Sequence, residues 1–319
     1  MLTIGRKALQ LVVVFVVVTF FTVVLMSLVP GKPENVVVPF DNTPGQVIQK
    51  RFVSDNNLDR PLPVQWAKWA QRFVTGDLGQ YYRPSSTETV TSRLGPSVSV
   101  SAALILYTML LSLLVAIPLA VLAAYRSGGW IDKIVNMTAF GMISLPSFAA
   151  ALLLSYYLGV KLNWLPTQGY VRPTEDLVGH LKSVAIPVIA LSLGQIAVYM
   201  RLLRSDLVAT LQEDFILMAK SKGVSNSRVL WRHALRPSSL TILTVAGLNV
   251  GTLIGGTVVI ETLLGIPGVG FLLGEAVLAR QYVALQSLVA VIAIVFVLLN
   301  FAVDALYSVL DPRIRERTA

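Results

Sequence analysis

The sequence lacks cysteine and has little charge. Its 319 residues include no cysteine, which excludes disulfides, thiolate metal sites and cysteine nucleophiles. Charged side chains make up only 13% of the chain, well below the roughly 25% of soluble domains. The two histidines, His180 and His233, have no second histidine or acid at metal-ligand spacing. These shortages argue against a soluble enzyme that works with a thiol or a metal.

The chain is instead rich in long hydrophobic runs. Hydrophobic residues make up 55% of it, and several runs approach or exceed the roughly 20 residues that a helix needs to cross a bilayer core. Membrane barrel strands would show short alternating segments. We therefore predict an all-α polytopic membrane protein with six transmembrane helices, at about 8–29, 98–125, 134–158, 183–204, 239–262 and 282–308.

The first run and the segment after it have distinct features. The run is longer than the roughly 7–15 apolar residues of a cleaved signal, so we expect an uncleaved first span. Residues 30–98 are polar and rich in proline, and they contain Trp66, Trp69 and Phe73 at helical spacing. This spacing predicts an amphipathic helix. The pattern leaves open whether that helix lies at the membrane interface or packs within a small loop fold.

The distribution of basic residues predicts the orientation. The net charge is +9, and there is no basic platform interleaved with aromatics, as nucleic-acid binding would need. Lys and Arg concentrate in the short loops that share a side with the N-terminus, and cytoplasmic loops carry such an excess. Both termini are therefore predicted to be cytoplasmic. The opposite short loops hold only Lys161, Arg172, Lys182 and Arg280.

The loop between the fourth and fifth spans is helical by pattern. Leu207, Leu211, Phe215 and Met218 form one apolar stripe, which predicts a helix from about Ser205 to Lys222. Gly223 fits the left-handed position that follows a helix.

A second short helix is expected directly afterwards. Ser225 or Asn226 can begin it, and Arg228, Arg232 and Arg236 then form a basic stripe. Such a helix-turn-helix either docks on a cytoplasmic motor or anchors the spans at the membrane surface. The residues alone favour neither reading.

Several segments resemble one membrane-protein family. Ala219, Lys222 and Gly223, followed by His233-Ala-Leu-Arg236, resemble the coupling loop of ABC-importer permeases for dipeptides and oligopeptides. Of the more general importer pattern, only Ala219, Gly223 and Leu235 match. Further similar segments run along nearly the whole chain in order, among them Leu28–Gly31, Gly76–Gly79, Ser144–Phe148, Pro267–Gly270 and Asp311–Arg315.

The resemblance implies a type I ABC-importer permease fold, with this chain as the first of two membrane subunits. It implies a second homologous permease subunit as heterodimer partner, two ATP-binding subunits, an extracytoplasmic solute-binding protein and a bacterial inner-membrane location. ATP and Mg²⁺ would bind the partner subunits, because the sequence contains no phosphate-binding loop. This chain itself would be no enzyme and would bind no cofactor. The implied substrate is a short peptide, and related importers carry nickel complexes or glutathione.

The resemblance also implies a domain division and the residues of each site. The expected parts are 1–97, with the first span and an extracytoplasmic segment, a permease core at 98–308, and a cytoplasmic tail at 309–319. The coupling loop would be 205–238. Its expected site residues are Asp214, Phe215, Met218, Ala219, Lys222, Gly223, Arg228, Arg232 and His233.

Two further groups stand out in the last third of the chain. Gly247, Gly251 and Gly255 recur every four residues, which favours close helix packing near the translocation path. Glu261, Pro267, Gly268 and Gly270 are expected at an extracytoplasmic turn. For Glu261, local hydrogen bonding is a better reading than a proton relay, because no chain of acids crosses the spans.

Two rival functions remain. A secondary transporter would show inverted repeats and ionisable groups at mid-membrane, and we find no convincing internal repeat. A membrane scaffold would use residues 30–98 and the basic loop as docking surfaces. ATP-dependent uptake separates these from an importer.

Overall fold

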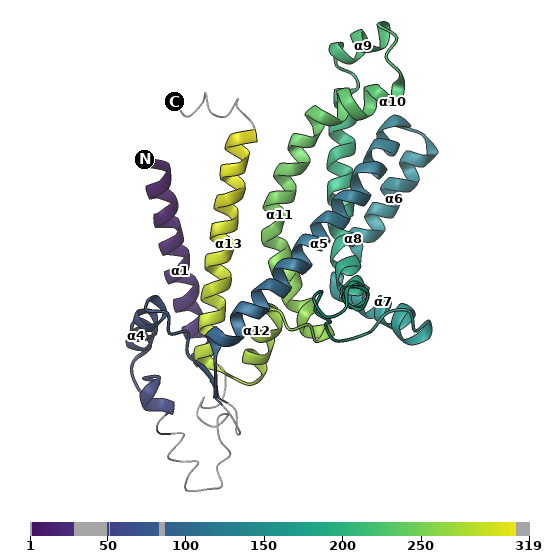
Figure 1. Cartoon of the computed structure of the whole chain (residues 1–319). Coiled ribbons are helices and arrows are strands. Elements are labelled where there is room, and N and C mark those ends of the chain that lie inside the picture. Colours follow the sequence, from purple (N-terminus) through teal and green to yellow (C-terminus); the bar gives the residue numbers. More distant parts are fainter. Residues whose placement is uncertain (1, 29–49, 51, 83–86, 311–319) are drawn as a thin grey trace. The chain divides into compact units, whose positions relative to one another are not determined.

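The computed structural model describes most of the chain (Figure 1). The residues described are 2–28, 50, 52–82 and 87–310. The Leu28–Gly31 motif beyond Leu28, the Asp311–Arg315 motif and nearly all of the predicted tail lie outside them.

The described chain forms two compact units. The first unit is Met1–Ser101 with Pro267–Leu298, and the second is Ala102–Ile266 with Leu299–Ala319. Both are helical, as the composition predicts. The helices are α1 (Leu2–Leu28), α4 (Leu62–Val74), α5 (Val90–Tyr125), α6 (Trp130–Ser144), α7 (Ser147–Leu154), the π-helix η1 (Ser155–Lys161), α8 (Leu177–Thr210), α9 (Asp214–Ser221), α10 (Asn226–Arg228), the π-helix η2 (Val229–Ala234), α11 (Leu235–Leu264), α12 (Val269–Leu278) and α13 (Tyr282–Leu310).

Five of the predicted spans are confirmed as long apolar helices among the described residues. The third predicted span, 134–158, falls on two helices, α6 and α7–η1, which meet at a bend of 96°. Proline explains the bend. Pro146 has no N–H to continue the helix and holds Leu145 in an extended conformation (φ −94°, ψ 112°). Six spans result only if this bent pair counts as one.

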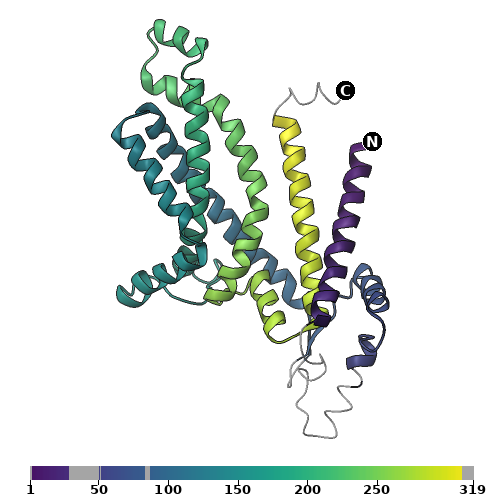
Figure 2. The same ribbon diagram turned by 180° about the vertical axis from the view of Figure 1, so that it is seen from behind.

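In the first unit, α4 is a packed helix. The Trp69 side chain is buried, and its Nε1 donates a hydrogen bond to the Ser287 hydroxyl of α13 (3.0 Å). Trp66 Nε1 donates to the Thr19 hydroxyl of α1 (2.9 Å). The aromatic stripe therefore faces α1 and α13, which lie next to each other in both views (Figures 1 and 2). The helix therefore packs on two membrane-length helices, and its place at the membrane interface stays a prediction.

A short hairpin, which the sequence reading missed, precedes α5. Strands β1 (Gln80–Tyr82) and β2 (Thr87–Thr89) pair antiparallel, with Tyr81 opposite Glu88. The Tyr81 side chain is buried, and its hydroxyl donates to the Leu272 carbonyl of α12 (3.2 Å). Arg93 of α5 lies 4.8 Å from the centre of the Tyr81 ring and forms an ion pair with Glu275 of α12 (2.7 Å). The hairpin thus ties the start of α5 to α12.

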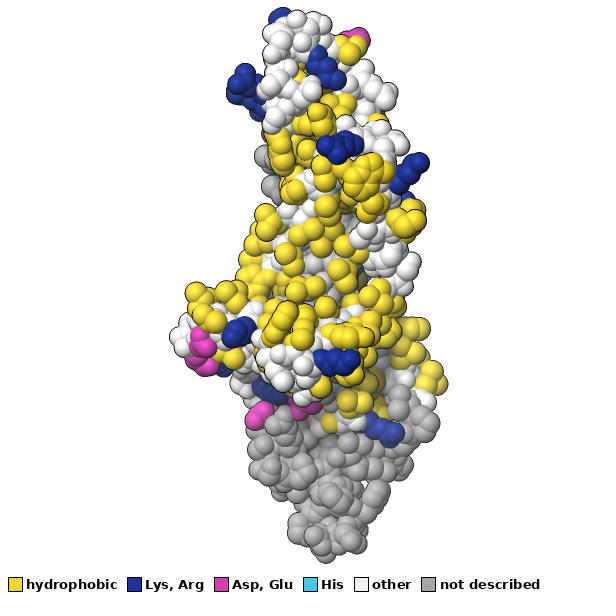
Figure 3. Space-filling model, turned by 90° about the vertical axis from the view of Figure 1, so that its right-hand side faces the viewer, with side chains coloured by type: hydrophobic (Ala, Val, Ile, Leu, Met, Phe, Trp, Pro, Cys, Tyr) yellow, Lys and Arg dark blue, Asp and Glu magenta, His cyan; other side chains and the backbone are white. Residues whose placement is uncertain are grey.

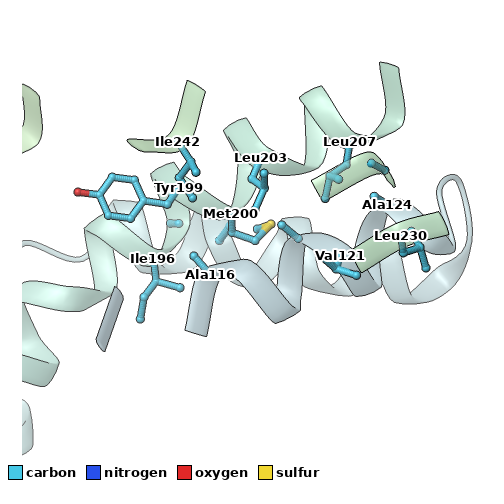
Figure 4. Packing of buried hydrophobic residues seen from close by; sticks show 14 of the residues in the cluster. Ala116, Val121, Ala124, Ile196, Tyr199, Met200, Leu203, Leu207, Leu230 and Ile242 are labelled. Carbon is cyan, nitrogen blue, oxygen red and sulfur yellow. The ribbon is translucent and has the colours of Figure 1, made fainter. Parts of the chain in front are cut away.

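The core of the second unit lies where α5, α6, α8 and α11 meet. Leu203 and Leu207 of α8 are fully buried there, against alanines of α5 that allow close approach (Figure 4). Burying an apolar side chain of this size contributes about 1.5–3 kcal/mol. We call this group the apolar cluster. Its members labelled in Figure 4 are Ala116, Val121, Ala124, Ile196, Tyr199, Met200, Leu203, Leu207, Leu230 and Ile242, and Ile216 of the following loop also belongs to it.

Candidate functional site

The loop between α8 and α11 forms one end of the second unit (Figure 1). The prediction of one helix over Ser205–Lys222 is wrong. α8 ends at Thr210, and a turn at 211–213 separates it from α9. Two backbone hydrogen bonds close the turn: Gln212 N donates to Ala209 O, and Glu213 N donates to Thr210 O (3.1 Å each). Glu213 and Asp214 then begin α9, where negative charge is favourable.

The break changes which side chains reach the core. Ile216 is fully buried in the apolar cluster, whereas Phe215 and Met218 of the predicted stripe are 46% and 58% exposed. A continuous helix would follow the spacing of Leu207, Leu211, Phe215 and Met218. The turn instead rotates α9 so that Ile216 anchors it.

Gly223 ends α9 in the left-handed conformation that the sequence predicts, with φ +77°. Its N–H donates to Lys220 O (2.9 Å), and Val224 N donates to Ala219 O (3.2 Å). This pair of bonds is the Schellman motif, which satisfies carbonyls at a helix end. A Cβ at Gly223 would meet no atom within 4 Å, so only the backbone conformation requires glycine there. The turn therefore fixes the direction in which the chain leaves α9.

The second short helix begins where it was predicted. Ser225 occupies the N-cap position of α10, with extended backbone angles, although its hydroxyl makes no capping bond in the described structure. The helix continues as η2 into α11, and Arg228, Arg232 and Arg236 are all exposed along it. The base of the loop is closed by a hydrogen bond between the Thr210 and Ser238 hydroxyls (3.0 Å).

The outer side of the loop exposes large apolar side chains beside basic ones. Phe215, Leu217 and Met218 of α9 are about half exposed, as is Trp231 of η2. We call these four residues the loop surface. Lys and Arg side chains gather at this end, whereas hydrophobic side chains cover the long helices below it (Figure 3). Exposed apolar residues rimmed by charge mark protein-interaction sites.

The remaining predicted loop residues take intermediate or exposed positions. Asp214 and Lys222 are exposed at the two ends of α9, while Ala219 and His233 are half-buried. The structure thus brings the predicted loop residues together on one compact helical element. Their role in coupling stays a prediction.

The glycine row of α11 has two different environments. A Cβ at Gly247 would lie 2.6 Å from the Val303 side chain of α13, so that position allows a close approach. A Cβ at Gly255 would meet nothing within 4 Å, and Gly251 is half-buried. The neighbouring Gly256 lies instead against Leu191 of α8.

The predicted turn lies at the end of α11. Glu261 is buried, and its carbonyl accepts a bond from Ile266 N (2.9 Å) after Gly265 turns left-handed (φ +64°). In the first unit, Gly268 is the N-cap residue of α12, and Gly270 lies buried in its first turn. Pro267, which precedes them, is exposed.

Sequence reasoning missed two polar contacts inside the second unit. Asn249 Nδ2 of α11 donates to Gln195 Oε1 of α8 (3.1 Å), and Arg204 of α8 pairs with Asp132 of α6. The signal was available, because amide and acidic side chains within membrane-length apolar helices need polar partners. Spacing along one helix does not indicate which partner that is.

Comparison with known proteins gives a consistent result. Residues 116–316 match the family described as binding-protein-dependent transport system inner membrane component. A probable peptide ABC transporter permease of Sinorhizobium fredii is 33% identical and covers 97% of this chain and 98% of its own length. A putative peptide transport system permease of Brucella abortus is 34% identical, with the same coverage. The dipeptide transport system permease DppB of Alkalihalophilus pseudofirmus is 28% identical, over 97% and 98%.

Proposed function

Because the chain belongs to the family of inner-membrane components of binding-protein-dependent transport systems, we propose that it is the permease subunit of an ATP-driven importer of short peptides. The observation that carries the proposal is similarity over 97% of the chain to permeases named for peptide transport. The membrane-length helices supply the body of a bacterial inner-membrane, multi-pass permease. The family match at 116–316 also includes the entire loop between α8 and α11.

The loop surface is the proposed docking site for an ATP-binding subunit. Phe215, Leu217 and Met218 would enter an apolar groove on that partner, with the surrounding cations as a polar rim. Ile216 holds α9 in the apolar cluster, so movement of α9 is passed to the helices that the cluster joins. Two arrangements of these helices, biased by nucleotide on the partner, amount to alternating access.

ATP hydrolysis would take place on other subunits. Two ATP-binding subunits would hold ATP and Mg²⁺, a second homologous permease would complete the path, and a solute-binding protein would deliver the peptide. The chain itself carries out transport rather than catalysis. The loop surface and both termini are then cytoplasmic, in agreement with the excess of Lys and Arg in the loops on that side.

Copurification and uptake test the proposal together. We expect affinity purification of this chain from its native membrane to recover a second permease and ATP-binding subunits. Proteoliposomes holding that complex should take up short peptides only with ATP and the binding protein. Recovery of the folded chain alone, with uptake driven by an ion gradient, would support a secondary transporter instead.

A further inference from the structure

Two amide side chains meet near the middle of two membrane-length helices in the second unit. Gln195 lies near the centre of α8 (Leu177–Thr210), and Asn249 lies near the centre of α11 (Leu235–Leu264). They are joined by the 3.1 Å bond from Asn249 Nδ2 to Gln195 Oε1. Both side chains are half-buried, so part of each remains open toward the outside of the unit.

The bond leaves hydrogen-bonding capacity unused. After it forms, Gln195 retains its Nε2 donor, and Asn249 retains its Oδ1 acceptor. Exchanging the oxygen and nitrogen of both amides leaves the same result, namely a donor nitrogen on one side chain and an acceptor oxygen on the other. A polar group without a partner is unfavourable in an apolar setting. The pair is therefore suited to a further polar ligand.

Tyr199 adds a third polar group one turn further along α8. Its side chain is fully buried, and its ring belongs to the apolar cluster, but the hydroxyl points away from that cluster (Figure 4). The hydroxyl is fully enclosed and interacts with the Asn249 side chain. Tyr199 therefore lies behind the amide pair, where it would position Asn249 rather than touch a ligand.

The surroundings leave room for a ligand. A Cβ at Gly194, next to Gln195, would meet no atom within 4 Å, and the same holds for Gly255 on α11. Small residues at these two positions leave the outer face of both helices uncovered within the described unit. A ligand would approach the amides from this open face.

We propose that Gln195 and Asn249, with Tyr199 behind them, form a contact site for the main chain of the peptide as it crosses the membrane. A peptide bond offers one acceptor and one donor, which complements the donor and acceptor that the amide pair leaves free. Such contacts do not depend on peptide side chains. They also allow release, because a hydrogen bond between neutral groups contributes little net free energy.

A contact with the second permease is the rival reading of these residues, because Asn and Gln side chains also form hydrogen bonds between membrane helices. A path for a polar substrate instead needs binding groups that are strong enough to admit it and weak enough to let it leave. The helices that carry the amides are also the two that flank the loop surface. Movement of that loop would therefore alter the spacing of the amide pair.

The inference rests on the proposed function and is tested in the same proteoliposomes. The probe is a radiolabelled alanine peptide, dialanine or trialanine, whichever the wild-type complex carries. We expect Gln195→Met with Asn249→Leu to lower the maximal uptake rate at least tenfold at saturating binding protein, without loss of ATP hydrolysis. Thr252→Val is the matched control, because Thr252 is exposed one turn from Asn249 and its hydroxyl donates to the Asn249 backbone carbonyl rather than to an amide side chain. Uptake at the wild-type rate in the double variant would overturn the inference while leaving the proposed function intact.

A photoreactive residue in place of Val198 provides a second readout that does not depend on the activity of the variants. Val198 is 39% exposed and lies between Gln195 and Tyr199 on α8. We expect the labelled alanine peptide to become attached at this position during turnover. Attachment of the second permease without any peptide adduct would show a subunit contact and overturn the inference. If the wild-type complex takes up no peptide, the proposed function fails and the inference falls with it.

Discussion

Arg204 of α8 holds both carboxylate oxygens of Asp132, which lies in the first turn of α6. Its Nε and Nη2 each donate to one oxygen. Asp132 also accepts from the backbone N–H of Gly128 (2.9 Å) and from Asn136 Nδ2 (2.8 Å), and it is 4% exposed. A bidentate ion pair whose carboxylate accepts further hydrogen bonds has a defined geometry. It joins α6 to α8 just before the loop that leads to α9.

Removing one member of this pair should destabilise the chain. Asp132→Ala leaves the Arg204 charge in a place built for a carboxylate, and we expect a loss of about 3 kcal/mol in unfolding free energy. The double variant Asp132→Leu with Arg204→Met should lose less than Asp132→Ala. Thermal unfolding of the purified chain in detergent measures the difference. Equal midpoints for wild type and Asp132→Ala would show that the pair contributes nothing.

Gly223 tests the coupling role of the loop. Proline cannot adopt φ +77° and also removes the bond to Lys220 O, so Gly223→Pro should leave the protein inserted but separate ATP hydrolysis from uptake. Gly223→Ala should show a smaller effect, since the left-handed conformation costs it about 1–2 kcal/mol. Gly223→Asn is the control, because asparagine tolerates this conformation. Normal peptide uptake per ATP in Gly223→Pro would remove the coupling assignment.

Ile216 should matter more than its neighbour Leu217. Truncating the buried Ile216 to alanine removes the anchor of α9 and costs about 2–5 kcal/mol of local stability. Leu217→Ala, at a position 53% exposed, is the matched control. Limited proteolysis of the loop should be faster only in Ile216→Ala. Equal cleavage rates in the two variants would contradict the anchoring role.

Charges on the loop surface should block docking without unfolding the chain. Phe215→Asp with Met218→Asp places two carboxylates at positions already about half exposed, so we expect little loss of thermal stability. Copurification of the ATP-binding subunit should fall at least tenfold. Ser227→Asp adds charge at an exposed position of α10 outside the loop surface and should leave copurification unchanged. Undiminished copurification in the double variant would place the docking site elsewhere.

The bond between Trp69 and Ser287 should stabilise the first unit. Trp69→Phe leaves the buried Ser287 hydroxyl without its donor, which costs about 1–3 kcal/mol. Ser287→Ala should cost a similar amount, and the double variant less than the sum, because both changes remove the same bond. Thermal unfolding of the three variants in detergent provides the measurement. Strict additivity would show that the bond carries no energy of its own.

Local sequence patterns correctly predicted structural features that depend on a single helix end or turn. The left-handed Gly223 and the start of α10 after Ser225 were predicted, because capping depends on a few adjacent residues. The bend at Pro146 was missed, although proline supplied a signal for it. Proline is tolerated inside membrane helices when neighbours satisfy the freed backbone groups, and the sequence does not show whether they do. The helix α8 is the opposite case, because it continues unbroken with Pro187 in its interior.

The sequence by itself determined that this is a helical membrane protein, where most of its spans lie, and which family it resembles. These properties follow from hydrophobicity and from motifs that adjacent residues carry. Only the tertiary structure decided that Ile216 rather than Phe215 and Met218 anchors α9, and that Gln195 meets Asn249. Both outcomes depend on neighbours distant in the sequence, because the rotation of a helix is set by the side chains that pack against it.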